Sequence, residues 1–108
     1  MKIANKDARS FVQRQHPFEG SNMFAQFKPE GDGVRYIVYS YGEHFPMYIN
    51  CKGVWFENED KYSPTTSKHM TQARPTDKTI LLASEWMRKL ASEGYVAIAS
   101  SRILGESM

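Results

Sequence analysis

The stretch VRYIVYSY at residues 34–41 decides the fold, because it is the strongest strand signal in the chain. It is rich in β-branched and aromatic residues, which favour extended backbone in a sheet. Alternate residues along a strand point to opposite faces, and neither face of this segment is polar throughout. The pattern therefore predicts a central strand that is covered on both sides.

Further strands are expected on either side of this segment. SNMFAQF (21–27) precedes it across the turn residues PEGDG, and MYINC and VWFEN follow it around Lys52-Gly53. Strands joined by such short connections usually pair as antiparallel neighbours. The middle of the chain therefore predicts an antiparallel meander of about four strands.

Helix signals flank the predicted meander. Asn5 suits the start of a first helix that ends before Pro17, because the residue before a proline is disfavoured in a helix. Ser63-Pro64 predicts the start of a short helix over about 64–72, and SEWMRKLASEG (84–94) has helical apolar spacing.

Two apolar segments complete the predicted order. TILLA (79–83) predicts a short strand, and YVAIA (95–99) predicts a returning edge strand. We therefore expect an α+β domain, with an N-terminal and a C-terminal helix packed on the meander.

Length and composition set the broad class. The chain has 108 residues, of which 41% are hydrophobic and 13% aromatic, which predicts one globular domain over 1–108 with frayed ends at 1–4 and 102–108. Its single cysteine, Cys51, has no partner for an internal disulfide. No apolar run is long enough to span a bilayer, and the N-terminus lacks the apolar core of a signal peptide. We expect a cytoplasmic protein.

Hydroxyl and cationic side chains concentrate in KYSPTTSKHMTQARP (61–75). The free N–H groups at a helix start, together with such side chains, suit a phosphate or a carboxylate. The same side chains also suit local capping and solvation, which is the alternative for this segment. The candidate binding residues here are Thr65, Thr66, Ser67, Lys68, His69 and Arg74.

Aromatic residues crowd the middle third of the chain, around the loop GEHFP (42–46). Exposed aromatic side chains serve as interface anchors or as stacking platforms for unpaired bases. The alternative is a sheet core whose tyrosine tips reach water. The aromatic-loop candidates, which we expect to be exposed, are Tyr41, His44, Phe45 and Tyr48.

The net charge of +2 is small, but the basic side chains are clustered. Segments 1–16 and 61–78 each carry four basic side chains against one acidic side chain. If one segment neutralised about three phosphates, duplex affinity would fall about 40-fold between 50 and 200 mM salt. Whether the two segments meet in space is left open by the sequence.

Catalytic and metal signatures are weak. The three histidines lie far apart in the chain and no paired ligand spacing accompanies them, so neither a metal nor a cofactor is predicted. Cys51 with His44 or His69 is a conceivable nucleophile and base, but no flanking signature supports the pair. The question of an enzyme is left open, and absence of catalysis is favoured.

The combination of SYGEHFP (40–46) with WFENEDKYSPTTSKHMTQARP (55–75) resembles a family of small tailed-phage proteins. The shared features are a Tyr-Ser-Tyr-Gly strand end, a following His and Pro, and a Tyr-Ser-x-Thr-Thr-Ser-Lys-His stretch. The resemblance covers roughly residues 9–75 and brings no established activity. It implies an accessory protein of phage origin that binds a host component or nucleic acid.

Our leading functional expectation is a non-catalytic phage accessory protein. It would bind a host protein or complex in the host cytoplasm, as an inhibitor of host or defence machinery. One alternative is nucleic-acid binding through the basic segment 61–78 and the basic first helix. A second alternative is a small hydrolase or nucleotide-binding enzyme. The identity of the partner and the oligomeric state are left open.

Overall fold

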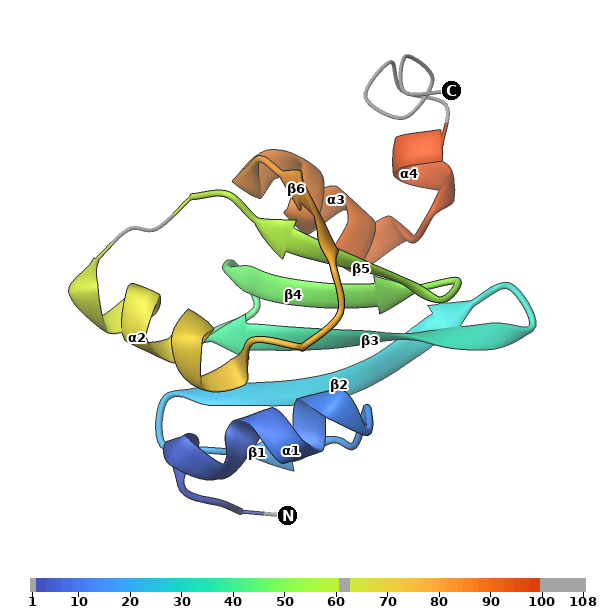
Figure 1. The fold of residues 1–108 in the computed structure, drawn as a ribbon. Coiled ribbons are helices and arrows are strands. Elements are labelled where there is room, and N and C mark those ends of the chain that lie inside the picture. The colour runs from blue at the N-terminus through green and yellow to red at the C-terminus, as the bar shows by residue number, and fades with distance from the viewer. Residues whose placement is uncertain (1, 61–62, 100–108) are drawn as a thin grey trace.

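The computed structural model describes residues 2–60 and 63–99, which form three layers (Figure 1). Within these residues a six-stranded sheet, ordered β1-β2-β3-β4-β5-β6, forms the middle layer. Helices α1 and α2 pack on one face, and α3 and α4 pack on the other. The elements are η1 (Asn5–Asp7), α1 (Ala8–Gln13), β1 (Phe18–Glu19), β2 (Met23–Glu30), β3 (Gly33–Ser40), β4 (Pro46–Cys51), β5 (Val54–Asn58), α2 (Pro64–Ala73), β6 (Thr79–Leu82), α3 (Ser84–Glu93) and α4 (Val96–Ala99).

The prediction of a central strand covered on both faces is confirmed. After its first two residues, every residue of β3 is buried, and so is every residue of the neighbouring β4. The turn between β4 and β5 is formed by Lys52 and Gly53, which both have positive φ, as a tight two-residue hairpin requires. The antiparallel series from β2 to β5 matches the expected meander.

The sheet differs from the expected one at its two edges. The short strand β1 pairs with β2 and was not expected. At the other edge, β6 pairs with β5 in parallel, so the prediction of a purely antiparallel sheet of about four strands is wrong. The cause is α2, which carries the chain back along the sheet so that β6 starts at the same end as β5.

Each face of the sheet has its own hydrophobic core. On the α1–α2 face, the aromatic rings of Tyr36 and Trp55 meet edge to face, and Met70 of α2 is fully buried with them. On the α3–α4 face, Ile37, Tyr39, Ile49, Cys51, Phe56, Leu82, Met87, Leu90, Ala91 and Ile98 pack together. The alternating side chains of β3 contribute to both cores, which explains why neither of its faces is polar.

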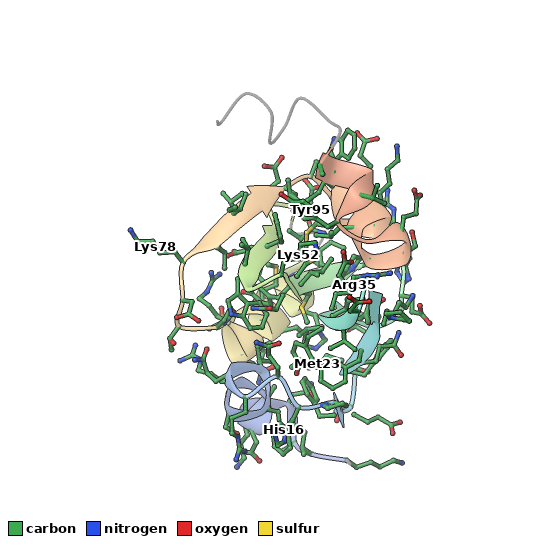
Figure 2. The ribbon with its side chains drawn as sticks, turned by 90° about the vertical axis from the view of Figure 1, so that its right-hand side faces the viewer. His16, Met23, Arg35, Lys52, Lys78 and Tyr95 are labelled. Carbon is green, nitrogen blue, oxygen red and sulfur yellow. The ribbon has the colours of Figure 1, made fainter. Side chains whose placement is uncertain are left out.

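The expected edge strand at 95–99 is wrong, because Val96–Ala99 is the helix α4. The carboxylate of Glu30 accepts hydrogen bonds from the backbone N–H of Tyr95 and holds the chain beside the end of α3. The chain then turns into a helix that buries Ile98 against α3 instead of pairing with the sheet. Figure 2 shows Tyr95 at this end of the molecule, near Lys52.

The buried guanidinium of Arg35 joins the sheet to α3 (Figure 2). It donates through Nε and Nη2 to the carbonyl of Ala91, at 3.0 and 2.7 Å, and through Nη1 to the carbonyl of Pro29. Nη1 also lies 3.3 Å from Glu30 Oε1. A cation placed on the last carbonyls of a helix satisfies them and favours the negative end of the helix dipole.

At the N-terminus, fraying was expected for residues 1–4. Ile3 donates its backbone N–H to the carbonyl of Glu19, and Lys2 forms an isolated bridge with Glu19. Residues 1 and 102–108 of the expected frayed ends lie outside the described residues.

We predict that Gly94→Ala destabilises the fold. Gly94 has φ +90, and an added Cβ would lie 2.6 Å from Glu30 Oε1, which would displace the carboxylate that holds Tyr95. The free energy of unfolding, measured by urea titration, should fall by about 2–3 kcal/mol.

Gly53→Ala is the matched control for this variant. Gly53 has φ +79 but no atom within 4 Å of an added Cβ. The free energy of unfolding of this variant should therefore fall by only about 1 kcal/mol, the cost of placing alanine at positive φ. Equal losses for the two variants would contradict the role assigned to Glu30.

Candidate functional site

Helix α2 carries the hydroxyl-rich segment and starts as its sequence predicts. Ser63 is the N-cap, and its Oγ accepts from the backbone N–H of Thr66 at 3.2 Å. Pro64 follows at the first helical position, where a missing N–H leaves no bond unmade. The helix runs to Ala73, which agrees with the expected 64–72, whereas Lys61 and Tyr62 lie outside the described residues.

The structure divides the predicted hydroxyl and cation cluster between the surface and the interior. Thr65 and Lys68 are exposed and Ser67 is half-buried, while Thr66 and His69 are buried. The hydroxyl of Thr66 lies 3.2 Å from Ser63 Oγ, as part of the cap. Only part of the cluster therefore faces solvent, because the helix must turn one side toward the sheet.

His69 points into the protein and joins α2 to the end of β3. Its Nδ1 lies 2.8 Å from Ser40 Oγ, and both residues are almost completely buried. The ring of Tyr41 lies over it, with 5.4 Å between the ring centroids. Burial, with a smaller contribution from Lys68, lowers the pKa of His69 below its ordinary value. This imidazole is a structural contact and not a free donor for a ligand.

The aromatic loop is only partly exposed. Tyr41 is 55% exposed and His44 is exposed, but Phe45 and Tyr48 are buried, so the expectation that all four face solvent is wrong. Phe45 and Tyr48 belong to the core on the α1–α2 face, because helices cover both faces of the sheet at β4, which is buried throughout. Tyr48 donates its hydroxyl to the carbonyl of Met70 at 2.9 Å.

Arg74 is largely committed to an internal ion pair. Its Nη1 lies 3.0 and 3.1 Å from the two carboxylate oxygens of the buried Glu57, which also accepts from the hydroxyl of Thr79 at 2.7 Å. The guanidinium lies over the ring of Tyr48. A buried carboxylate needs such partners, so the main role of Arg74 is to pair with Glu57 within the fold and not to bind a ligand.

The two basic segments converge in the structure. Arg9 of α1 donates to the carbonyl of Thr71 of α2 at 2.9 Å. Further along, the amide of Gln13 donates to Thr76 Oγ1 and accepts from its backbone N–H, at 2.8 and 2.6 Å. The two helices therefore lie side by side and run in the same direction (Figure 1).

Parallel helices bring their exposed lysines to the same end. Lys6 precedes Arg9 by about one turn, and Lys68 precedes Thr71 by about one turn, so both lie on the N-terminal side of the Arg9–Thr71 contact. We call the exposed basic residues of these helices, Lys6, Arg9, Arg14 and Lys68, the basic helix face; Arg14 lies at the C-terminal end of α1, away from the two lysines. Tyr41 lies at the same end, because it contacts His69, the residue after Lys68.

A pocket of about 480 Å³ adjoins Tyr41. Its lining runs through residues 17–25, including Glu19, Ser21 and Asn22. Tyr41 is held in an uncommon conformation for a residue with a side chain, φ +68, and its N–H donates to the carbonyl of Asn22 at 2.7 Å. Non-glycine residues held in this region are enriched at binding sites.

Other chemistry finds little support in the described residues. Cys51 is buried, and burial raises the pKa of its thiol to about 11, so it is a poor nucleophile at neutral pH. Among residues 2–60 and 63–99, no three histidine, cysteine or acidic side chains gather as metal ligands would. None of the helices in this part of the chain has the length and apolarity needed to cross a membrane.

Comparison with known proteins found no matching family model, curated protein or solved structure. The resemblance to a tailed-phage family therefore stays a prediction. The site is defined by its own geometry: a basic face on two parallel helices, an exposed tyrosine and an adjoining pocket.

We predict that His69 makes stability depend on pH. The pKa of His69 is lowered in the folded protein, so below the ordinary value of 6.5 the unfolded chain takes up a proton that the folded protein resists. The stability that the neutral His69 contributes is fully present above pH 6.5. It is lost as the pH falls toward the pKa that His69 has in the folded protein. The free energy of unfolding of the wild-type protein, measured by urea titration, should decrease more steeply as the pH falls than that of His69→Gln.

His44→Gln is the control, since His44 is exposed. It should retain the decline seen in the wild-type protein. A decline of the same steepness in wild type and in His69→Gln would contradict the assignment to His69.

Proposed function

We propose that the protein is a non-catalytic binding protein whose ligand is single-stranded nucleic acid. The observation that carries the proposal is the convergence of α1 and α2, through the Arg9–Thr71 and Gln13–Thr76 contacts. The sequence had left this convergence open, and nucleic-acid binding depends on it. Without it, neither segment has enough cations for appreciable affinity.

The charge of the two-helix layer suits a phosphate backbone. The exposed basic side chains Lys6, Arg9, Arg14 and Lys68 lie on adjacent helices, and Asp7 is the one acidic side chain of η1 and α1. Thr65 and the half-buried Ser67 add hydroxyl groups near Lys68. Such a surface binds phosphates through charge. Its described residues form no element that would enter a major groove and read the bases.

Tyr41 favours a single strand over a duplex. An exposed aromatic ring next to a basic groove offers a stacking surface for an unpaired base, whereas the bases of a duplex are already stacked. Tyr41 is 55% exposed and adjoins the pocket formed by residues 17–25. The proposal places the strand backbone on the basic helix face and a base on Tyr41.

The leading expectation from the sequence, capture of a host protein through the aromatic loop and the segment 65–69, has less support. Phe45 and Tyr48 belong to the core, which leaves Tyr41 and His44 as the exposed residues of the aromatic loop. With Thr66 and His69 also buried, the exposed part of this contact is small, whereas stable protein complexes bury about 800 Å² on each partner. Origin in a phage and inhibition of host machinery stay predictions.

An enzymatic role also has less support. The Ser40 and His69 pair has the spacing of a nucleophile and its base, at 2.8 Å. Both residues are buried, at 1% and 2% exposure, and Tyr41 lies over the imidazole. A substrate would have no access to Ser40 Oγ, so the pair serves to attach α2 to the sheet.

The electrostatic part of the proposal is tested by a salt titration. If the four basic side chains contact four phosphates, the slope of log affinity against log salt should be about −2.8, which is about 50-fold between 50 and 200 mM salt. Fluorescence anisotropy of a labelled single-stranded oligonucleotide measures this. Lys6→Gln with Lys68→Gln should halve the slope.

Arg88→Gln with Lys89→Gln is the control pair, because it removes the same charge from exposed positions of α3, on the opposite face. It should change the slope little. Absence of single-strand binding by the wild-type protein at about 50 mM salt, or tighter binding to a duplex than to a single strand, would overturn the proposal.

The stacking part is tested by Tyr41→Gly. Glycine accepts φ +68 without strain, so this variant removes the ring without straining the folded backbone. Affinity for a single strand should fall by about 1–3 kcal/mol, at least fivefold, with an unchanged salt slope. Tyr41→Phe keeps the ring and should bind as the wild type. Equal affinity of Tyr41→Gly and wild type would remove Tyr41 from the site.

A further inference from the structure

Strand β6 forms an open, apolar edge of the sheet. It is the last strand in the sheet order, and no described residue pairs with its outer side. Ile80 and Leu81 are 41% and 57% exposed and point to opposite faces of the sheet. Figure 2 shows Lys78, just before β6, pointing away from the molecule at this edge. An exposed apolar edge strand is a template for another strand.

The pairing with β5 determines which backbone groups of β6 face outward. The carbonyl of Leu82 accepts from the N–H of Glu59, which follows β5, so the backbone groups of Leu82 point inward. Successive residues of a strand direct these groups to alternate sides. The N–H and C=O groups of Thr79 and Leu81 therefore point outward, and no described residue bonds to them.

We propose that two copies of this chain pair through β6, antiparallel and related by a two-fold axis that passes beside Ile80. In this register Thr79 of each copy lies opposite Leu81 of the other. Both residues have outward-pointing N–H and C=O groups, so each pair exchanges both backbone hydrogen bonds. Ile80 lies opposite Ile80 of the second copy, which covers apolar surface on the α3–α4 face.

The structure disfavours the neighbouring two-fold register, which is centred on Leu81. That register would place Thr79 opposite Ala83 and would need the carbonyl of Ala83. This carbonyl already accepts from the N–H groups of Trp86 and Met87 at the start of α3. The register centred on Ile80 uses only groups that the described part of the chain leaves unused.

Charge along the edge agrees with a second copy as the occupant. The end of β6 lies near the exposed carboxylates of Glu59 and Glu85, whereas Lys78 precedes its start. Antiparallel pairing brings Lys78 of each copy toward the acidic end of the other and keeps the two acidic ends apart. Asp77, next to Lys78, makes this attraction modest, so the apolar and backbone contacts carry the pairing.

Disulfide trapping tests the register. Residues opposite each other in a non-hydrogen-bonded antiparallel pair have Cα atoms about 4.5 Å apart, within the range of a disulfide. Ile80→Cys should form a covalent dimer under mild oxidation, and Leu81→Cys should form much less. The native Cys51 is buried, so it will not compete. Preferential trapping of Leu81→Cys would overturn the register.

Sedimentation over a range of protein concentrations tests the association itself. The wild-type protein should shift from monomer to dimer, and Leu81→Lys should remain monomeric, because a lysine at the edge opposes strand addition. Val34→Lys is the matched control, since Val34 is 56% exposed at the start of β3, and it should dimerise as the wild type. A wild-type protein that stays monomeric, or a Leu81→Lys dimer, would overturn the proposal.

Discussion

The two central strands, β3 and β4, are buried on both faces, and this burial organises the rest of the molecule. A strand with two apolar faces needs cover on each side, and a single helix covers only one. The chain meets this requirement by placing α1 and α2 over one core and α3 and α4 over the other. The parallel strand β6 follows from the same requirement, because α2 must pass over one face between β5 and β6.

Buried charges attach the helical layers to the sheet. Arg35 on β3 satisfies the end of α3 through the carbonyl of Ala91, and Glu57 on β5 holds Arg74 at the end of α2. A buried charge without partners costs several kcal/mol, so each of these contacts specifies where its helix must end. The Ser40–His69 hydrogen bond attaches the middle of α2 to the sheet without a buried charge.

The proposed binding surface depends on this attachment. The buried side of α2 is committed to the sheet through Thr66, His69 and Met70, which leaves Thr65 and Lys68 outside. The same placement lets α1 lie along α2, so that basic side chains from distant parts of the sequence share one face. The cations of the proposed site are therefore positioned by contacts between other residues. Arg9 is the exception, because it belongs to the proposed site and also makes one of these contacts.

The sequence by itself determined the local features of this protein. The strand β3, predicted at 34–41 and found at Gly33–Ser40, the hairpin at Lys52-Gly53 and the helix starting at Ser63-Pro64 depend on neighbouring residues, because turn geometry, capping and alternation are short-range effects. The tertiary structure alone decided which face of α2 is buried, that β6 runs parallel, and that residues 96–99 form a helix. It also decided how α3 starts: Asp60, far from it in sequence, accepts from the backbone N–H of Ser84, the first residue of the helix. Each of these outcomes depends on a partner many residues away, which no local pattern in the chain encodes.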